Sequence, residues 1–391
     1  MNRYSCQVLI LCLSLILACD SEKNFIQNFR QAEMEIVFGR HRARNENIVR
    51  NNIPLEVKVW LHSKTFQKTD VSSQVKWQYQ DTTLGTIVYN DSLKAYTYFY
   101  QGRKTGFQRI TAHFQNYLAS REFEVTPVEI VPIPGGEFQM GSETTDETAE
   151  KPVHPVLVND FRMGKYEVTN LEYLGFLNAM LEVDSVAYEI EQRNGFYQTF
   201  GNGRLILETE KSFIKFANYV AFIQDTLFND LPVTGVTWDG ALMFAHYYGL
   251  ELPTEAEWEY ACKAQTENEY PGGDPTNLAE YAWYLGSCVN CLNPQPVGLL
   301  MPNQFSLYDL HGNVYEWCFD IYDKNFYSQG DSLTYDNPSG PQDFREIIFE
   351  RVIRGGSFES LDIECRSTYR GKQFQNKGEI SVGFRVVRAT R

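Results

Sequence analysis

Residues 354–357 read Arg-Gly-Gly-Ser, and the segment Phe358-Glu-Ser-Leu-Asp-Ile-Glu-Cys365 follows them directly. This stretch belongs to a series of short motifs that stand in a fixed order after Val128. In that region the chain has short elements, many Gly and aromatic residues, and long irregular links. The other motifs are Ile133-Pro-Gly-Gly-Glu-Phe-Gln-Met-Gly141, Tyr166-Glu-Val-Thr-Asn170, Leu231-Pro-Val-Thr-Gly-Val-Thr-Trp238, Leu252-Pro-Thr-Glu-Ala-Glu-Trp-Glu-Tyr-Ala-Cys262, Leu307-Tyr-Asp-Leu-His-Gly-Asn-Val-Tyr-Glu-Trp317 and Gly383-Phe-Arg385.

The ordered series closely resembles the sulfatase-modifying factor, or formylglycine-generating enzyme, domain over residues 128–391. The resemblance implies an α+β fold of the C-type-lectin-like kind with little regular structure. It also implies a chemistry, because catalytic members use copper and O₂ to oxidise a cysteine of a nascent sulfatase to formylglycine. Two cysteines that follow the Arg-Gly-Gly-Ser hold Cu(I) in those members, since this soft ion prefers sulfur ligands.

The copper-binding pair is altered in this chain. Counted without gaps, Ser360 takes the place of the first cysteine and Cys365 that of the second. Aligning Arg366-Ser-Thr-Tyr-Arg370 with the family's next strand instead takes Cys365 off both positions. Serine is a hard oxygen donor and does not replace a Cu(I) thiolate. Two hypotheses follow: a non-catalytic binding or assembly module, and a copper-dependent oxidase that converts a sulfatase cysteine to formylglycine.

The resemblance also predicts a ligand groove and a calcium loop. The groove that holds a peptide in catalytic relatives is expected near Arg354, Ser357, Ser360 and Arg366. The segment Asp309–Glu316 resembles the family's calcium loop, and an all-oxygen ligand set suits a structural Ca²⁺. The alternative is a turn in which Asp and Asn side chains bind their own backbone. The implied ligands are the side chains of Asp309 and Glu316 and the carbonyls of Gly312 and Val314.

The first residues resemble a bacterial lipoprotein signal. Arg3 precedes an apolar run from Val8 to Ala18, which is too short to span a bilayer comfortably. The run ends in Ile16-Leu-Ala-Cys19, so residues 1–18 are expected to be removed and Cys19 to be lipidated. Acidic residues after Cys19 resemble the surface-export signal of Bacteroidetes lipoproteins. We therefore expect a cell-envelope protein anchored by lipid to the outer membrane, either in the periplasm or at the surface.

Besides the lipidated Cys19, five cysteines remain in the mature chain, where disulfides are allowed. Cys288-Val-Asn-Cys291 is predicted to form a local disulfide in preference to a zinc site, because no second such motif is present. In family members, the cysteine after the Trp and the cysteine before the Arg-Ser often occur together. The resemblance therefore implies a Cys318–Cys365 disulfide, with Cys262 as the other candidate partner of Cys365.

The remaining sequence separates into a tether, a β domain and the motif-bearing domain. Residues 19–50 are predicted to be a tether and first strand. In residues 51–126, apolar residues such as Val57 and Val59 alternate with polar ones, and short strand patterns recur, which predicts an immunoglobulin-like sandwich. Thr126-Pro127 marks the boundary, and residues 127–391 form the second domain. There, Thr254 and Glu257 form a capping-box pattern that predicts the start of a helix.

The charge of the chain bears on its partners. The formal net charge is −15, and no basic stripe is present, which disfavours nucleic acid. The expected partners are the membrane through the lipid anchor, and envelope proteins or a peptide or glycan ligand. The glycan possibility follows from the lectin-like fold and the aromatic residues. Similar domains occur in gliding-motility and type IX secretion lipoproteins, which favours an assembly role by analogy.

Overall fold

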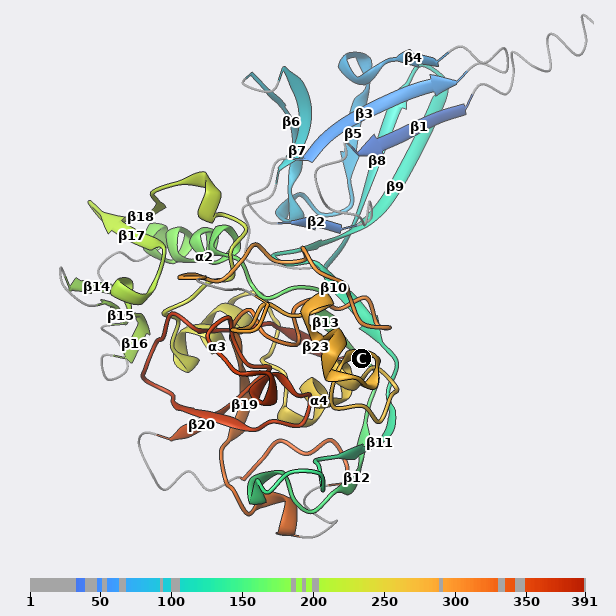
Figure 1. Cartoon of the computed structure of the whole chain (residues 1–391). Helices are drawn as coiled ribbons and strands as arrows, with labels where there is room; N and C mark the ends of the chain where they lie inside the picture. Colours follow the sequence, from blue (N-terminus) through green and yellow to red (C-terminus); the bar gives the residue numbers. More distant parts are fainter. Residues whose placement is uncertain are drawn as a thin grey trace, which may run out of the picture. The chain divides into compact units, whose positions relative to one another are not determined.

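The computed structural model describes residues 33–38, 48–50, 55–62, 68–91, 94–99, 106–183, 188–191, 195–198, 204–287, 291–329, 335–341 and 349–389. The chain divides at the Thr126–Pro127 junction into two compact units, Met1–Thr126 and Pro127–Arg391 (Figure 1). The predicted signal segment, Cys19 and Cys288 lie outside the described residues. Within the described ranges, no helix is long and apolar enough to cross a bilayer.

The first unit consists of two β-sheets. One has the strand order β1-β3-β7-β6 with β4 paired to β3, and the other has the order β2-β9-β8-β5. Residues of both sheets, among them Val59, Tyr98 and Phe123, share one hydrophobic core. The predicted alternation is confirmed, because Val57 and Val59 are buried while Lys58 is exposed. The immunoglobulin-like assignment stays a prediction. The strands are β1 (Glu33–Phe38), β2 (Ile48–Arg50), β3 (Leu55–His62), β4 (Lys68–Asp70), β5 (Lys76–Tyr79), β6 (Thr86–Asn90), β7 (Ala95–Phe99), β8 (Gly106–Phe114) and β9 (Tyr117–Thr126).

The second unit is a mixed α+β domain made of short elements. Its strands form small separate sheets, of which the largest described has the order β21-β20-β19-β22. The helices are α2 (Asn170–Val183), α3 (Trp238–Tyr247) and α4 (Glu255–Lys263). The strands are β10 (Ile130–Ile133), β11 (Gly136–Met140), β12 (His154–Val158), β13 (Phe161–Gly164), β14 (Tyr188–Glu191), β15 (Gly195–Gln198), β16 (Arg204–Leu207), β17 (Ile214–Ala217), β18 (Val220–Ile223), β19 (Tyr315–Ile321), β20 (Glu350–Arg354), β21 (Gly371–Phe374), β22 (Val382–Gly383) and β23 (Val387–Ala389).

Helix α4 begins at the predicted capping box. The Thr254 hydroxyl accepts the N–H of Glu257 at 3.1 Å, and the Glu257 carboxylate accepts the N–H of Thr254 at 2.9 Å. The helix ends after Lys263, where Ala264 adopts a left-handed conformation with φ of 47°. Its side chains are almost all buried, including Trp258, which packs in a core shared with β11 and β12. The helix is therefore an internal support, and its buried acidic residues need partners.

Strand β20 ends at Arg354, and a tight turn follows. Gly355 and Gly356 have φ values of 96° and 75°, a region that side chains with a Cβ rarely adopt. A Cβ on Gly356 would stand 2.6 Å from the sulfur of Cys365. The two glycines therefore let the chain fold back so that the short 3₁₀ helix Asp362–Cys365 packs onto the Arg-Gly-Gly-Ser segment.

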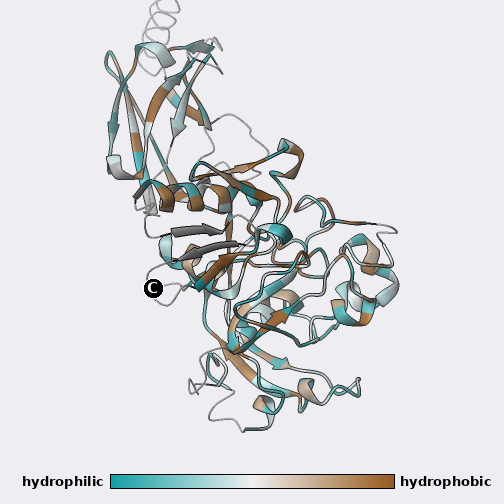
Figure 2. Cartoon of the chain, turned by 90° about the vertical axis from the view of Figure 1, so that its left-hand side faces the viewer, coloured by the Kyte–Doolittle hydropathy of each residue, from teal (hydrophilic) through white to brown (hydrophobic). Residues whose placement is uncertain are grey.

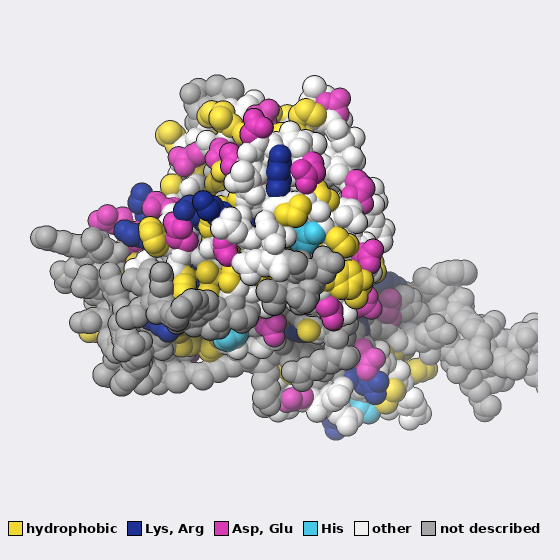
Figure 3. Space-filling view, turned by 90° about the horizontal axis from the view of Figure 1, so that it is seen from below, with side chains coloured by type: hydrophobic (Ala, Val, Ile, Leu, Met, Phe, Trp, Pro, Cys, Tyr) yellow, Lys and Arg dark blue, Asp and Glu magenta, His cyan; other side chains and the backbone are white. Residues whose placement is uncertain are grey.

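Polar and apolar residues are distributed as expected for a globular fold. Hydrophobic and hydrophilic residues alternate along many strands of both units (Figure 2). On the face of the molecule seen in Figure 3, acidic side chains are spread out, with Lys and Arg side chains among them. The excess of 50 acidic over 35 basic residues is therefore not gathered in one patch on that face.

The capping residue Glu257 gives a prediction for the pH dependence of stability. Burial raises its pKa from 4.5 to about 7, so the folded state favours the protonated carboxyl. The stabilisation that comes from the raised pKa of Glu257 is fully present below the pKa that this carboxyl has in the unfolded chain. It is lost as the pH rises towards about 7. A glutamine keeps the capping acceptor but does not ionise. Between about pH 5 and about pH 8, we expect the wild type to lose roughly 1–3 kcal/mol of unfolding free energy relative to Glu257→Gln.

Chemical unfolding across this pH range, followed by tryptophan fluorescence, measures the difference. Glu182→Gln, on an exposed position of α2, is the matched control and should follow the wild type. Parallel pH profiles for Glu257→Gln and the wild type would contradict the assignment.

Candidate functional site

The predicted site residues Ser357 and Ser360 lie together in a buried hydroxyl network. Their side-chain oxygens are 3.3 Å apart, and the Ser360 hydroxyl accepts the N–H of Ser357 at 3.1 Å. The Ser360 hydroxyl also donates to the Tyr315 hydroxyl at 3.1 Å, and Tyr315 donates to the Glu364 carboxylate at 3.1 Å. The oxygen at the position predicted for the first copper ligand is thus engaged within the protein.

Cys365 lies in an apolar surrounding close to these serines. It is fully buried and packs with Leu278, Ala282, Tyr270 and Tyr284. Burial, together with the nearby Glu364 and Asp362, raises the pKa of the thiol above its ordinary value, so it is protonated at neutral pH. A hydroxyl and a single cysteine sulfur do not form the pair of thiolates that Cu(I) requires. The residues present therefore do not fit the copper centre.

The predicted Cys318–Cys365 disulfide is wrong. Cys262, Cys318 and Cys365 are free and buried thiols, which also excludes a Cys262–Cys365 bond. The reason is that the cysteines pack in different places: Cys262 and Cys318 belong to the core around α4, whereas Cys365 belongs to a separate small cluster. Cys291 is disulfide-bonded, and its predicted partner, Cys288, lies outside the described residues.

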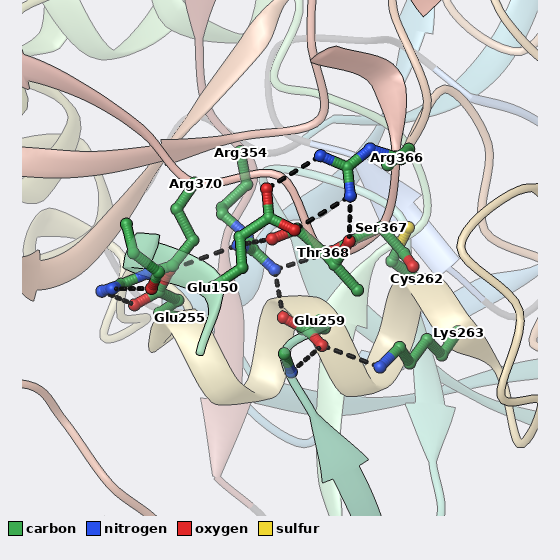
Figure 4. Close-up of polar contacts among 12 residues, drawn as sticks. Glu150, Glu255, Glu259, Cys262, Lys263, Arg354, Arg366, Ser367, Thr368 and Arg370 are labelled. Atoms are coloured by element: carbon green, nitrogen blue, oxygen red, sulfur yellow. Dashed lines mark hydrogen bonds and ion pairs between the residues drawn. The ribbon is translucent and has the colours of Figure 1, made fainter. Parts of the chain in front are cut away.

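Arg354 does not line a groove, contrary to the prediction. It is fully buried, and its guanidinium pairs with the carboxylates of Glu255 (3.3 Å) and Glu259 (Figure 4). It also donates to the carbonyls of Ser367 at 2.7 Å and Thr368 at 3.1 Å. Arg354 therefore joins the end of β20 to helix α4 and to the segment that follows Cys365.

Arg366 is likewise buried in ion pairs, so its assignment to a ligand groove is also wrong. Its guanidinium binds both carboxylate oxygens of Glu150, at 2.8 and 2.9 Å, and one of Glu269 at 3.3 Å. Arg370 forms a second bidentate pair with Glu255, with both distances 2.7 Å. The three arginines share one region with their carboxylate partners (Figure 4), and they position the segment 354–370 instead of facing solvent.

Glu259 links this network to the start of the domain. Its carboxylate pairs with Lys263 at 2.8 Å and accepts the N–H of Gly141 at 2.9 Å, in addition to its contact with Arg354. Burial alone would raise the pKa of Glu259, but Lys263 and Arg354 outweigh it, so the pKa is lowered. Glu259 is therefore ionised at neutral pH.

The predicted calcium ligands Asp309 and Glu316 lie close together, but their oxygens are not equally free to bind a cation. Both carboxylate oxygens of Glu316 pair with Arg385 at 2.6 Å, and one also accepts the indole N–H of Trp258 at 2.8 Å. Asp309 accepts the N–H of Gly298 through Oδ2 at 2.7 Å, while its buried Oδ1 has no hydrogen-bond partner. A free buried carboxylate oxygen suits a hard cation, whereas the ion-paired Glu316 does not.

An acid from another part of the chain, Glu167, packs against this loop, and the sequence did not reveal it. Glu167 accepts the side-chain N–H of Asn313 at 2.9 Å, so Asn313 orders the loop. Burial, with Asp309 and Glu316 nearby, raises the pKa of Glu167 well above its ordinary value. Throughout the described part of the chain, no cluster of three or more His, Cys, Asp or Glu side chains has the geometry to hold a metal. Structural Ca²⁺, with the carbonyls of Gly312 and Val314 as ligands, stays a prediction.

A second pair that the sequence did not reveal is Cys262 with His311. The sulfur lies 3.4 Å from Nε2 of the imidazole, and Nδ1 lies 2.7 Å from the carbonyl oxygen of Cys365. Burial lowers the pKa of His311 to about 4 and raises that of the Cys262 thiol. The pair is therefore a neutral thiol beside a neutral imidazole. The two residues are 49 positions apart, and no spacing rule in the sequence connects them.

Comparison with known proteins identifies the family. The family model for the sulfatase-modifying factor enzyme 1-like domain matches residues 116–390, and the chain belongs to this family. The predicted family and α+β fold are thereby confirmed. Among solved structures, PvdO from Pseudomonas aeruginosa aligns at 23% identity with a TM-score of 0.49, covering 67% of this chain and 95% of that one.

Curated relatives carry two kinds of name. Serine/threonine-protein kinase pkn1 of Chlamydia pneumoniae is 30% identical over 262 residues, which cover 66% of this chain but only 38% of that protein. The formylglycine-generating enzyme of Bos taurus is 29% identical over 292 residues, covering 66% of this chain and 74% of that protein. The formylglycine-generating enzyme of Thermomonospora curvata is 27% identical over 293 residues, covering 63% of this chain and 90% of that protein. This chain thus matches well under half of the kinase-named relative.

The buried carboxylate Glu259 gives a prediction for stability. Glu259→Ala leaves Lys263 without its ion pair and Arg354 with one carboxylate fewer, both in a buried site. We expect a loss of about 3–5 kcal/mol, the usual effect of breaking a buried pair. The matched control is Glu350→Ala, which removes an exposed pair with Lys372 and should change stability by less than about 1 kcal/mol. Equal effects of the two substitutions in chemical unfolding would contradict a central role of the network.

Proposed function

We propose that the chain is a cell-envelope lipoprotein whose sulfatase-modifying-factor domain is not an oxidase and acts as a binding or assembly module. The observation that carries the proposal is the state of the two copper-ligand positions. Ser360 supplies a hydroxyl that is hydrogen-bonded to Tyr315, and Cys365 supplies only one sulfur. Formylglycine generation needs thiolates at both positions, so this part of the domain is better suited to a role in structure and recognition.

The surface over the same segment supports a binding role. Leu285, Leu361 and Ile363 expose 52%, 56% and 47% of their surface. The N–H of Leu285 donates to the carbonyl of Ser360 at 3.0 Å, which brings Leu285 beside the residue that precedes Leu361. Neighbouring exposed apolar side chains are typical of sites that bind other proteins. Envelope proteins with an apolar peptide segment are the partners that this surface fits, while glycans remain the alternative ligand class.

The names of the relatives do not by themselves assign an activity. The kinase-named proteins are matched over 38% and 41% of their length, so most of each lies outside the shared region. The family model describes a sulfatase-modifying factor domain across the matched part of this chain. A kinase activity is therefore not proposed. The copper-dependent oxidase is the competing hypothesis, because formylglycine-generating enzymes are among the relatives.

A copper and peptide assay separates the two hypotheses. The purified chain is incubated with Cu(I), reductant, O₂ and a peptide with the pattern Cys-x-Pro-x-Arg, and the peptide is then weighed by mass spectrometry. We expect no conversion of cysteine to formylglycine and no Cu(I) retained against a chelator. A formylglycine-generating enzyme run in parallel shows that the assay works. Ser360→Cys, which restores a second sulfur, is the variant expected to retain more Cu(I). Conversion by the wild type would overturn the proposal.

Lipid anchoring is tested separately. When the full chain is expressed in a bacterium with the lipoprotein pathway and fed a traceable fatty acid, we expect label on the protein and recovery with the membranes. Cys19→Ala removes the expected lipidation residue and should abolish the label. Cys12→Ala, which changes a cysteine inside the predicted signal segment, is the matched control and should leave the label intact. Equal labelling of Cys19→Ala and the wild type would refute the lipoprotein assignment.

A further inference from the structure

A cavity lies where helix α3 packs against helix α2 and strand β16 (Figure 1). Its volume is about 410 Å³, which is within the range of pockets that hold small molecules. Its apolar walls are the half-buried side chains of Met180 on α2 and of Leu242, Met243 and Tyr247 on α3. None of the lining residues belongs to the segment 354–370, so the cavity is separate from the predicted copper positions.

Helix α3 also presents polar groups to this cavity. Asp239, Met243 and His246 follow one another at steps of four and three residues, a spacing that places them on one face of the helix. His246 is exposed, and its imidazole has at least one N–H donor in either protonation state. The cavity therefore combines an apolar wall with a hydrogen-bond donor at its edge.

Arg204, the first residue of β16, is the charged donor of the cavity. The strand is fixed to the start of α3, because the N–H of Thr237 donates to the carbonyl of Ile206 at 3.2 Å. The helix can come this close because residue 240 is glycine, where a Cβ would stand 2.1 Å from the oxygen of Ile206. Nη1 of Arg204 thereby pairs with the Asp239 carboxylate at 2.7 Å. Since 55% of the Arg204 side chain is exposed, the other N–H groups of the guanidinium are open to a ligand.

Positive charge exceeds negative charge around Asp239. The guanidinium of Arg351 lies near this carboxylate as well, and its own hydrogen bonds go to uncharged groups. Burial lowers the pKa of Arg351 to about 10, so it is charged at neutral pH. Asp320, the other acid near Arg351, is protonated at neutral pH because burial raises its pKa to about 8. Arg204 and Arg351 therefore share one ionised carboxylate, in a chain of net charge −15, and an anion is the ligand that balances them.

We propose that this cavity is a binding site for small carboxylates with an apolar chain, such as a medium-chain fatty acid. The carboxylate accepts N–H groups of Arg204 and His246, which form charge-assisted hydrogen bonds with it. The chain packs against Leu242 and the two methionines, Met180 and Met243, whose flexible side chains adapt to its shape. This site goes beyond the binding or assembly role proposed above and does not depend on it, because the two use different residues.

The test compares three ligands of equal chain length: octanoate, which is anionic, octylammonium, which is cationic, and octanol, which is neutral. Each is titrated into the full mature chain with isotope-labelled methionine methyl groups, and binding is followed by NMR. The signals are assigned by replacing each methionine in turn with leucine. We expect octanoate to shift the signals of Met180 and Met243 and to leave that of Met301, an exposed methionine outside the cavity, unchanged. Octanoate should bind at least about tenfold more tightly than the other two ligands.

The variant Arg204→Gln examines the charged donor. It should weaken the binding of octanoate by about tenfold to about 100-fold and leave the binding of octanol unchanged. Arg109→Gln is the matched control and should bind octanoate like the wild type, because Arg109 is 57% exposed and also forms an ion pair, but in the first unit.

The comparison of the three ligands needs no variant, so it stands even if Arg204→Gln does not fold. The proposal is overturned if octanoate at about 10 mM shifts neither Met180 nor Met243, since even a weak small ligand binds at that concentration. It is also overturned if octylammonium binds as tightly as octanoate, or if folded Arg204→Gln binds octanoate as tightly as Arg109→Gln.

Discussion

The second unit depends on the buried ion pairs between helix α4 and the chain that follows β20. Glu255 and Glu259 are one helical turn apart and hold Arg354, while Glu255 also holds Arg370. A buried charge that loses its partner is far more destabilising than a lost surface contact. These pairs therefore fix the position of the chain more strictly than apolar packing, which tolerates repacking. The segment with Ser357, Ser360 and Cys365 begins and ends at arginines held by the same helix.

This anchoring does not require the chemistry that catalytic relatives perform. None of the ion pairs that hold the segment involves residue 360 or the sulfur of Cys365. The Ser360 hydroxyl is instead satisfied by Ser357 and Tyr315. A change from cysteine to serine at this position therefore leaves the support of the segment intact. The position of the segment and the contacts of residue 360 therefore depend on different interactions.

The sequence predicted the features that depend on local patterns. Thr254 and Glu257 form the capping box because both partners belong to one helical turn, and Val57 and Val59 face the core because strands alternate. The predictions failed where a partner is distant in the chain. The sequence shows that Arg366 is charged, but not that Glu150, 216 positions away, will meet it. For the same reason, the family resemblance predicts a Cys318–Cys365 disulfide, although the two cysteines pack in different clusters.

Around the loop from Asp309 to Glu316, buried negative charge exceeds positive charge, and either protonation or a bound cation can neutralise the excess. Glu167, Asp309 and Glu316 are all buried near Arg385, so three carboxylates share one guanidinium. Four of the five N–H groups of Arg385 bond to Glu316 and to two backbone carbonyls, and its ion pair is with Glu316. This excess of negative charge contributes to the raised pKa values of Glu167 and Asp309, because protonation removes the negative charge of a carboxylate that lacks a cationic partner. A bound cation would remove it as well, through the unpartnered oxygen of Asp309. The calcium prediction and the raised pKa values therefore have one physical origin, and a cation that binds at this loop must lower the pKa of both acids.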